Sequence, residues 1–209
     1  MIDATLRRKL SGSFNWLAVK LDNGFITPTG ITGVGLVLGI ASAVSAWNRL
    51  WILALLLWLT SRVLDALDGA LARIKSSRNI SYGPVGGFLD IVFDFIVYGS
   101  FVVGVGHGTR TSYLPFLLVL LTYYINGTSF LAFSSIAERE RITIDDGRSL
   151  SFIFGLAETT ETIVVHSLWC LFPSVAGNVA WVWAGFVGIS ACVRIIHSAK
   201  LLGRPQEGM

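Results

Sequence analysis

Six long apolar segments take up most of this chain. They lie at about residues 27–47, 50–72, 86–107, 113–136, 149–172 and 176–199. A helix that crosses a lipid bilayer needs about 20 mostly apolar residues, and each segment meets that length. The segments therefore predict an all-α integral membrane protein with six transmembrane helices joined by short connections.

The composition supports a membrane location for the whole chain. Of its 209 residues, 53% are hydrophobic and 14% are charged. An ordinary soluble domain carries about 25% charged residues. The predicted transmembrane domain covers 26–200, followed by a short cytoplasmic tail at 201–209. The two cysteines, Cys170 and Cys192, lie in apolar segments, so neither a disulfide nor a cysteine metal site is expected.

The first 25 residues are mixed and polar, which is not the pattern of a cleavable signal peptide. Apolar residues recur there at helical spacing among basic ones, at Leu6, Leu10, Phe14 and Leu17. This pattern predicts an amphipathic juxtamembrane helix at 1–25 that lies on the cytoplasmic leaflet, with a solvated basic tail as the alternative. The first span then begins at "ITPTGIT", where Thr27 can cap the helix and Pro28 suits its first turn.

Basic residues are distributed unevenly between the connections, and this bias orients the chain. With the N-terminus in the cytoplasm, twelve of them fall on the cytoplasmic side: Arg7, Arg8, Lys9, Lys20, Arg73, Lys75, Arg78, Arg139, Arg141, Arg148, Lys200 and Arg204. The opposite side then holds Arg49 and Arg110. We therefore expect a bacterial inner-membrane protein with both termini in the cytoplasm.

Four aspartates interrupt the apolar sequence in two pairs. Asp65 and Asp68 are three residues apart near the end of the second span, and Asp90 and Asp94 are four apart just inside the third. Each pair shares one face of a helix. The connection "RIKSSRNISYGPVG" contains three basic residues and is therefore expected in the cytoplasm. Antiparallel helices joined there would bring the two pairs to a similar depth, facing each other.

Such aspartates need compensation, because an ionised aspartate at the centre of a span costs about 3 kcal/mol. Four convergent carboxylates suit two hard divalent cations, Mg²⁺ or Mn²⁺, and the lack of neighbouring cysteine and histidine disfavours zinc. The alternative is ion pairing with Arg62, Arg73 and Arg78.

Small residues and a basic residue flank the acids. Gly69 and Ala72 follow the first acidic pair, and Gly86 precedes the second. They allow a backbone or a flat ligand to approach closely, while the guanidinium of Arg73 suits a phosphate oxygen. Two hard metals beside such a slot suit phosphoryl transfer.

The pattern Asp65-x2-Asp68-Gly69-x2-Ala72-Arg73, followed by Gly86-x3-Asp90-x3-Asp94, resembles the signature of the CDP-alcohol phosphotransferases, also called the CDP-alcohol phosphatidyltransferase family. All eight signature positions are present, and the six spans and N-terminal helix resemble the family layout. One difference is the twelve-residue link from Ile74 to Val85, which is longer than the family's usual one. Extra residues in a cytoplasmic connection cost little, so the predicted metal site is not affected.

The resemblance implies a homodimeric membrane enzyme that transfers a phosphatidyl group from CDP-diacylglycerol to an alcohol and releases CMP. Carried over by position, Asp65, Asp68 and Asp90 would bind two divalent metals, and Asp94 would help to hold the second metal and act as general base. The pocket for the cytidine diphosphate would be shaped by Gly69, Ala72, Arg73 and Gly86. No nucleic-acid partner is expected.

The acceptor alcohol is less constrained by the sequence. The fifth span carries Glu158 and Glu161, which either line an acceptor cavity or pair with Arg62 or Arg194. Arg194 lies within the sixth span, whereas Arg139 and Arg141 either hold an acceptor phosphate or reflect the cytoplasmic charge bias. These five residues form the candidate acceptor site. We expect a phosphorylated polyol, such as glycerol 3-phosphate or an inositol phosphate, with an amino alcohol as the alternative.

A divalent-cation transporter is the alternative from another functional class. A transporter predicts acids spread through the membrane depth or helices broken at the midplane. The four aspartates instead cluster at one interface beside glycine and arginine, which favours an enzyme. Two small-residue spacings, Gly35 with Gly39 and Gly104 with Gly108, are compatible with helix packing in a dimer.

Overall fold

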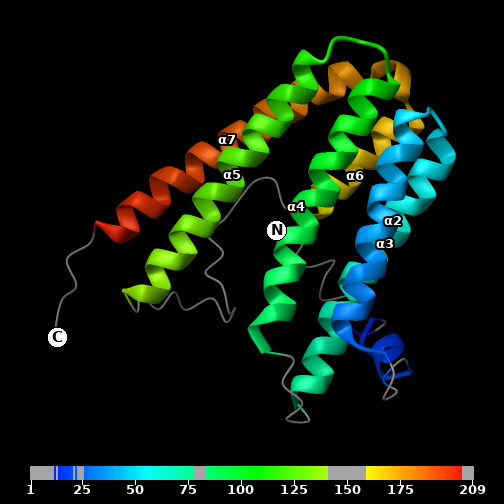
Figure 1. Cartoon of the computed structure of the whole chain (residues 1–209). Coiled ribbons are helices and arrows are strands. Elements are labelled where there is room, and N and C mark those ends of the chain that lie inside the picture. The colour runs from blue at the N-terminus through cyan, green and yellow to red at the C-terminus, as the bar shows by residue number, and fades with distance from the viewer. Residues whose placement is uncertain are drawn as a thin grey trace. The chain divides into compact units, whose positions relative to one another are not determined.

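The computed structural model describes residues 12, 14–20, 22, 26–77, 83–140 and 159–203, and these contain helices and no strand. The helices are α2 (Pro28–Trp47), α3 (Trp51–Ser77), α4 (Gly83–Gly108), α5 (Leu114–Arg139), α6 (Thr159–Leu171) and α7 (Ala176–Leu202). A 3₁₀ turn, η1 (Pro173–Val175), precedes α7, and residues 14–20 are also helical. Figure 1 shows these elements along the chain. The prediction of an all-α protein is confirmed for the described residues.

Four of the described helical segments are long and apolar enough to cross a membrane: Pro28–Trp47, Pro84–Gly108, Leu114–Arg139 and Pro173–Leu202. Helix α3 has 27 residues but carries Arg62, Asp65 and Asp68 in its middle, which lower its apolar character. Part of the span predicted at 149–172 lies outside the described residues, and its described part is α6, with 13 residues. The protein is therefore an integral membrane protein with at least four apolar helices of spanning length.

The chain forms two compact units. The first consists of Met1–Ser112 and Thr159–Gly177, and it contains α2, α3, α4 and α6. The second consists of Tyr113–Glu158 and Asn178–Met209, and it contains α5 and nearly all of α7.

Helix α2 begins as the sequence predicts. The side chain of Thr27 accepts a hydrogen bond from the backbone N–H of Gly30 at 3.1 Å, and Pro28 occupies the first turn, where no backbone donor is needed. The helix ends before Arg49, which adopts a left-handed backbone with φ of 63° and donates to the carbonyl of Ala46.

Small residues bring α2 close to α3 and α4. The Ser61 hydroxyl donates to the carbonyl of Gly35, and the Ser42 hydroxyl donates to the carbonyl of Ala54, each at 2.8 Å. A methyl group added to Gly39 would lie 2.5 Å from Val97 of α4, and one added to Gly104 would collide with the carbonyl oxygen of Ala43. The glycine spacings that suggested packing between subunits are thus used within this chain.

Aromatic side chains fill the centre of the first unit. Trp58 of α3 is fully buried and stacks on Phe101 of α4, with 4.6 Å between ring centroids. His166 of α6 is also fully buried and lies 4.7 Å from Trp58 and 4.6 Å from Trp169. This cluster joins α6 to α3 and α4, and the Trp58 ring also lies 5.3 Å from the guanidinium carbon of Arg62.

The helix at 14–20 packs against the acidic end of α3. Phe14 contacts a buried cluster formed by Ala18, Leu67, Ala70 and Leu71. Leu17 is exposed, as is Trp16, whose ring lies 3.9 Å from the Lys20 ammonium. The predicted apolar stripe therefore divides, because Phe14 faces protein while Leu17 faces outward. Leu6 and Leu10 lie outside the described residues.

In the second unit, the indole N–H of Trp183 on α7 donates to the hydroxyl of Tyr123 on α5 at 2.7 Å. A methyl group added to Gly188 would lie 3.5 Å from Thr122, so the absence of a side chain lets α7 approach α5 at this level.

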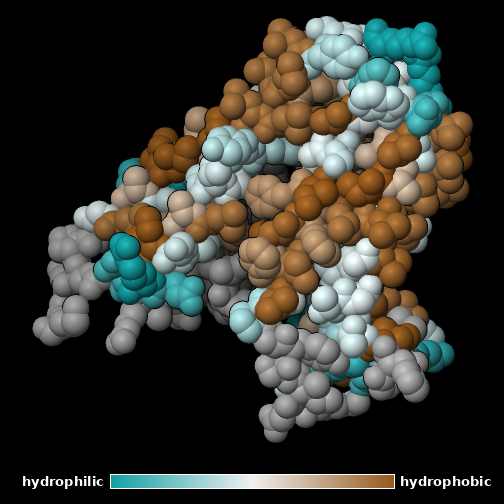
Figure 2. All heavy atoms as spheres, in the orientation of Figure 1, coloured by the Kyte–Doolittle hydropathy of each residue, from teal (hydrophilic) through white to brown (hydrophobic). Residues whose placement is uncertain are grey.

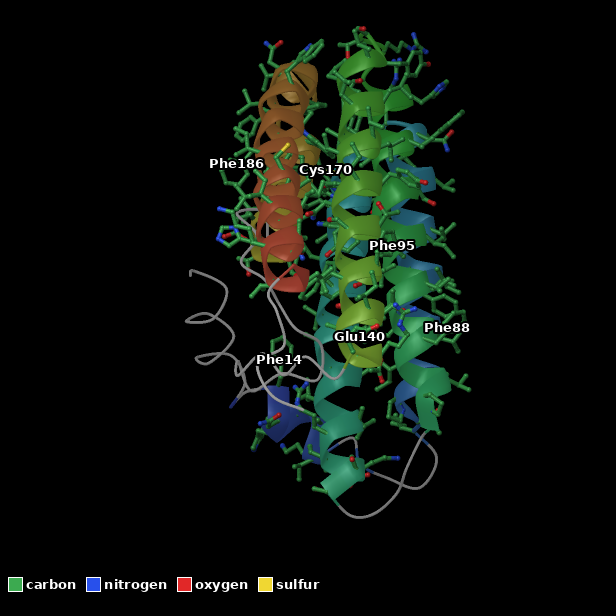
Figure 3. All side chains as sticks on the ribbon, turned by 90° about the vertical axis from the view of Figure 1, so that its left-hand side faces the viewer. Phe14, Phe88, Phe95, Glu140, Cys170 and Phe186 are labelled. Carbon is green, nitrogen blue, oxygen red and sulfur yellow. The ribbon has the colours of Figure 1, made fainter. Side chains whose placement is uncertain are left out.

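Large apolar side chains lie on the outer surfaces of the helices in both units (Figure 2). Phe88 and Phe95 project outward from α4, as Figure 3 shows, and they are 64% and 47% exposed. Such a surface would be unfavourable in water over this extent, and it is the surface expected of helices that face lipid.

Candidate metal and phosphoryl-transfer site

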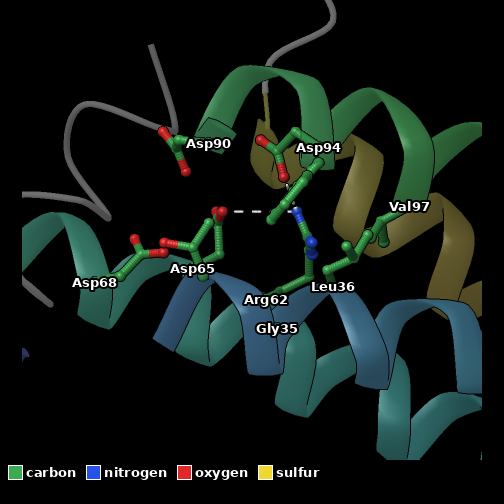
Figure 4. Close-up of a pocket in the computed structure, with 10 residues that line it drawn as sticks. Gly35, Leu36, Arg62, Asp65, Asp68, Asp90, Asp94 and Val97 are labelled. Atoms are coloured by element: carbon green, nitrogen blue, oxygen red, sulfur yellow. Dashed lines mark hydrogen bonds and ion pairs between the residues drawn. The ribbon is translucent and has the colours of Figure 1, made fainter. Parts of the chain in front are cut away.

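Three of the four predicted aspartates converge at one point in the first unit. Carboxylate oxygens of Asp65 and Asp68 on α3 and of Asp90 on α4 all lie within 4.8 Å of one another. The two residues of α3 share a helix face because they are three apart, and packing of α3 and α4 through α2 brings Asp90 opposite them. Figure 4 shows the three carboxylates turned toward a common space.

Asp94, the fourth aspartate, lies beside this group and forms an ion pair. Its Oδ1 accepts from Nη1 of Arg62 at 2.6 Å, and the same nitrogen lies 3.9 Å from Oδ2 of Asp65 (Figure 4). A pocket in the first unit is lined by the four aspartates together with Arg62 and Thr32. All four predicted aspartates thus line one pocket, and within it Asp94 is the one whose oxygen pairs most closely with Arg62.

The three clustered aspartates fit a hard divalent cation. Asp68 is 4% exposed, and its Oδ2 is buried without a hydrogen-bond partner among the described residues. A buried carboxylate oxygen in this state is strongly unfavourable unless a cation or a ligand compensates it. Three carboxylates without a nitrogen or sulfur ligand among them suit Mg²⁺ or Mn²⁺.

The small residues of the predicted nucleotide pocket border the acids. A methyl group added to Gly69 would lie 3.5 Å from Nη1 of Arg73, so the guanidinium reaches back over this glycine. Gly86 faces the start of α2, with Thr29 Oγ1 at 3.8 Å from an added methyl group. Arg73 is exposed, and Ala72 is partly buried beside it. This arrangement leaves a cationic fork next to an open surface near the acidic group, as phosphate binding requires.

The candidate acceptor residues are distributed over both units. Glu161 lies in the first turn of α6. Arg194 of α7 is 6% exposed, and its guanidinium carbon lies 5.5 Å from the ring centroid of Phe130. Arg139 ends α5, is exposed and pairs with Glu140 at 3.1 Å. Glu158 and Arg141 lie outside the described residues.

Arg62 is a residue of the site whose role the sequence did not define. The sequence named it as a pairing partner either for the aspartates or for the glutamates, and the structure pairs it with Asp94 and Asp65. The sequence does contain a signal for pairing with the aspartates. Arg62 is three residues before Asp65, and this spacing places both side chains on one helix face.

Known proteins resemble this chain in sequence and in fold. The family model for CDP-alcohol phosphatidyltransferase matches residues 25–191. The inner membrane protein YnjF of Escherichia coli is 32% identical over 93% of this chain and 100% of its own length. The archaetidylinositol phosphate synthase of Pyrococcus horikoshii is 27% identical, over 81% of this chain and 82% of its own.

Solved structures of the phosphatidylinositol phosphate synthase PgsA1 of Mycobacterium tuberculosis have the same fold. The form with CDP-DAG bound superposes with a TM-score of 0.69 at 19% identity, covering 94% of this chain and 98% of that one. The form in complex with manganese and citrate superposes with a TM-score of 0.68 at 18% identity, covering 94% and 93%.

The signature that spans α3 and α4, the convergence of its aspartates and the match over residues 25–191 agree with one another. The chain therefore belongs to the CDP-alcohol phosphatidyltransferase family, whose members are divalent-metal-dependent transferases.

Proposed function

We propose that this protein transfers a phosphatidyl group from CDP-diacylglycerol to a phosphorylated polyol and releases CMP. The observation that carries this proposal is the convergence of Asp65, Asp68 and Asp90, with Asp94 beside them. Family membership favours this enzyme over a cation transporter. The CDP-DAG bound to the Mycobacterium tuberculosis synthase supports the choice of donor.

Each residue of the site has a role in this proposal. Asp65, Asp68, Asp90 and one oxygen of Asp94 would hold two divalent cations, Mg²⁺ or Mn²⁺. When bound, such cations supply positive charge that stabilises the diphosphate oxygens during transfer. Gly69, Ala72, Arg73 and Gly86 would hold the cytidine diphosphate. These residues keep the phosphatidyl phosphorus near Asp94.

Asp94 would act as the general base. A carboxylate within hydrogen-bond reach of the acceptor hydroxyl can take its proton as the oxygen attacks. The new bond joins the acceptor oxygen to the phosphatidyl phosphorus, and the bond from that phosphorus to the CMP oxygen breaks. CMP leaves with the electron pair of the broken bond.

A phosphorylated acceptor is supported by the relatives and by Arg194. Two similar proteins are named as synthases of inositol phosphate lipids. A buried arginine in a membrane helix needs an anionic or aromatic neighbour, and a guanidinium binds phosphate well. Inositol phosphate is therefore the first acceptor to test, then glycerol 3-phosphate, with an amino alcohol as the alternative class.

The proposal also places the chain in the membrane. Six spans with both termini in the cytoplasm would put the acidic site at the cytoplasmic interface, where the donor keeps its acyl chains in lipid. A relative from Escherichia coli is named an inner membrane protein, which supports that location. We further propose a homodimer.

Release of CMP is the test of this function. Purified protein is incubated with CDP-dioleoylglycerol and Mn²⁺, with inositol phosphate, glycerol 3-phosphate, inositol or ethanolamine as acceptor. CMP release that depends on one acceptor identifies it, and we expect inositol phosphate. Absence of CMP with every acceptor would contradict the proposed donor, because the metal, the donor and the acceptors are all supplied.

Arg194→Ala tests the acceptor site. We expect the KM for the phosphorylated acceptor to rise by about tenfold or more, since a charge-assisted contact is worth about 1.5 to 3 kcal/mol. The KM for CDP-dioleoylglycerol should change little. Lys200→Ala is the matched control, because Lys200 is an exposed basic residue of the same helix and is not a candidate acceptor residue. Equal effects of Arg194→Ala on both KM values would make Arg194 structural.

A further inference from the structure

Arg62 is a buried cation near the acidic site, one helical turn before Asp65. Its side chain is 6% exposed, and its Nη1 lies 2.6 Å from Asp94 Oδ1 and 3.9 Å from Asp65 Oδ2. A buried guanidinium is strongly unfavourable unless it is paired, so this position requires an anionic partner. Asp94, on the neighbouring helix, is the closer of the two.

Contacts from α3 and α4 fix the orientation of the guanidinium, and α2 holds one of these partners in place. Nη2 of Arg62 donates to the Ser61 hydroxyl at 3.1 Å, and that hydroxyl donates to the Gly35 carbonyl of α2 at 2.8 Å. The guanidinium carbon lies 5.3 Å from the ring centroid of Trp58 on α3 and 4.8 Å from that of Tyr98 on α4. A planar group held by hydrogen bonds and by two rings has little freedom to rotate.

This arrangement distinguishes Asp94 from the other three aspartates. Asp65, Asp68 and Asp90 turn toward one another, whereas one oxygen of Asp94 is held by Arg62 (Figure 4). Fixing Oδ1 also fixes the direction of Oδ2, because the carboxylate is planar. Oδ2 is then the oxygen left to face both the proposed second cation and the acceptor hydroxyl.

We propose that Arg62 is a positioning residue for Asp94. It holds the carboxylate in the orientation from which Asp94 takes the proton of the acceptor hydroxyl, and its part in the reaction is exerted through Asp94. This inference rests on the proposed function, because it assigns Arg62 to the same reaction. It accounts for a buried cation beside acids that also bind cations, since Asp94, as the general base, needs a fixed orientation.

Kinetics combined with metal binding test this role. Arg62→Gln should lower kcat by about 100-fold, the effect of a misplacement of about 1 Å in a reacting group. The KM for CDP-dioleoylglycerol and the affinity for Mn²⁺, measured by electron paramagnetic resonance, should stay within about threefold of wild type. Arg62→Lys should give an intermediate kcat, because lysine restores the charge but not the planar fork.

A variant elsewhere on α3 serves as the matched control. Lys75 is also a buried cation of this helix, 4% exposed, and it donates to the Ile26 carbonyl at 2.6 Å. Lys75→Gln should lower thermal stability without lowering kcat. If Arg62→Gln keeps a kcat within about threefold of wild type, or loses Mn²⁺ binding along with activity, Arg62 does not position Asp94.

The Arg62–Asp94 contact is also tested without substrate, in metal-free protein. The effects of Arg62→Gln and Asp94→Asn on the unfolding temperature should be non-additive, because each variant removes the same ion pair. Additive effects would overturn the inference whatever the transfer activity. A wild-type protein that releases no CMP with any acceptor contradicts the proposed function instead, so the two failures are distinguishable.

Discussion

At the scale of single residues, the site depends on how buried carboxylates are compensated. Asp94 is compensated by Arg62 within the protein, whereas Oδ2 of Asp68 has no hydrogen-bond partner among the described residues. Carboxylate oxygens of Asp65 and Asp90 lie within 4.8 Å of an oxygen of Asp68. They add negative charge to the site and do not neutralise the charge of Asp68. The cluster is therefore the part of the site that needs a bound cation.

Asp68→Asn tests this need. The substitution keeps the size of the side chain and removes its charge. Loss of a group that only supports a metal ligand lowers metal affinity by about 10- to 100-fold. Because Asp68 would be a ligand itself, we expect Mn²⁺ affinity to fall by about 100-fold or more. Metal binding is measured by electron paramagnetic resonance of free Mn²⁺. Asp22→Asn is the control, because Asp22 pairs with Lys75 at 3.7 Å and is not in the cluster. Unchanged affinity in Asp68→Asn would remove Asp68 from the ligands.

At the scale of secondary-structure elements, close helix packing positions the acids. Gly39 and Gly104 let α2 and α4 approach until the backbone of one helix contacts the other, and Ser61 ties α3 to α2 through the Gly35 carbonyl. Because α3 and α4 both pack on α2, their acidic faces meet. Separation of α2 from α4 would move Asp90 away from Asp65 and Asp68.

Gly104→Ala tests this packing. The added methyl group would collide with the Ala43 carbonyl oxygen, so we expect a loss of stability of about 1–3 kcal/mol, as for other overpacked positions. Gly99→Ala, in the same helix, is the control, because nothing lies within 4 Å of the added methyl group. It should be neutral or stabilise by up to about 1 kcal/mol. Thermal unfolding in detergent measures both, and equal effects would show that α2 and α4 are not in close contact at Gly104.

At the scale of the whole molecule, metal binding should stabilise the fold, whereas the orientation in the membrane depends on the charges of the connections. The acidic cluster joins α3 and α4, so a bound cation links two helices that otherwise repel each other there. The outer surfaces of the helices are apolar, which favours insertion in lipid but does not set the direction of insertion. The direction depends on the basic residues of the connections.

Mn²⁺ should raise the unfolding temperature of the whole protein. A ligand that binds only the folded state stabilises it by about 2.7 kcal/mol at 100 times its dissociation constant. The double variant Asp68→Asn/Asp90→Asn should lose this shift. Differential scanning fluorimetry with and without EDTA measures it, and a shift that persists in the double variant would place the bound Mn²⁺ elsewhere.

Cysteine labelling tests the predicted orientation. In a background with Cys170→Ala and Cys192→Ser, a cysteine replaces either Ser77, after the second predicted span, or Ser112, before the fourth. Both positions are exposed. A membrane-impermeant maleimide should label Ser112→Cys in intact spheroplasts and Ser77→Cys only after permeabilisation. The reverse pattern would invert the proposed topology.

The sequence by itself determined the all-α fold class, the membrane location and the four aspartates that line the pocket. These depend on local periodicity, because residues three or four apart share a helix face in any packing, and because apolar length alone specifies a spanning helix. The start of α2 at Thr27 and Pro28 was predictable for the same reason.

Only the tertiary structure decided which acids cluster and which partner each one has. The pairing of Arg62 with Asp94 depends on the rotation of α3 relative to α4, and residues 32 positions apart carry no periodic signal of their contact. The same holds for Gly104, which the sequence associated with a dimer and which packs instead on Ala43 of its own chain. Contacts between helices are set by the packing of whole faces, and that packing becomes defined only when the helices are assembled.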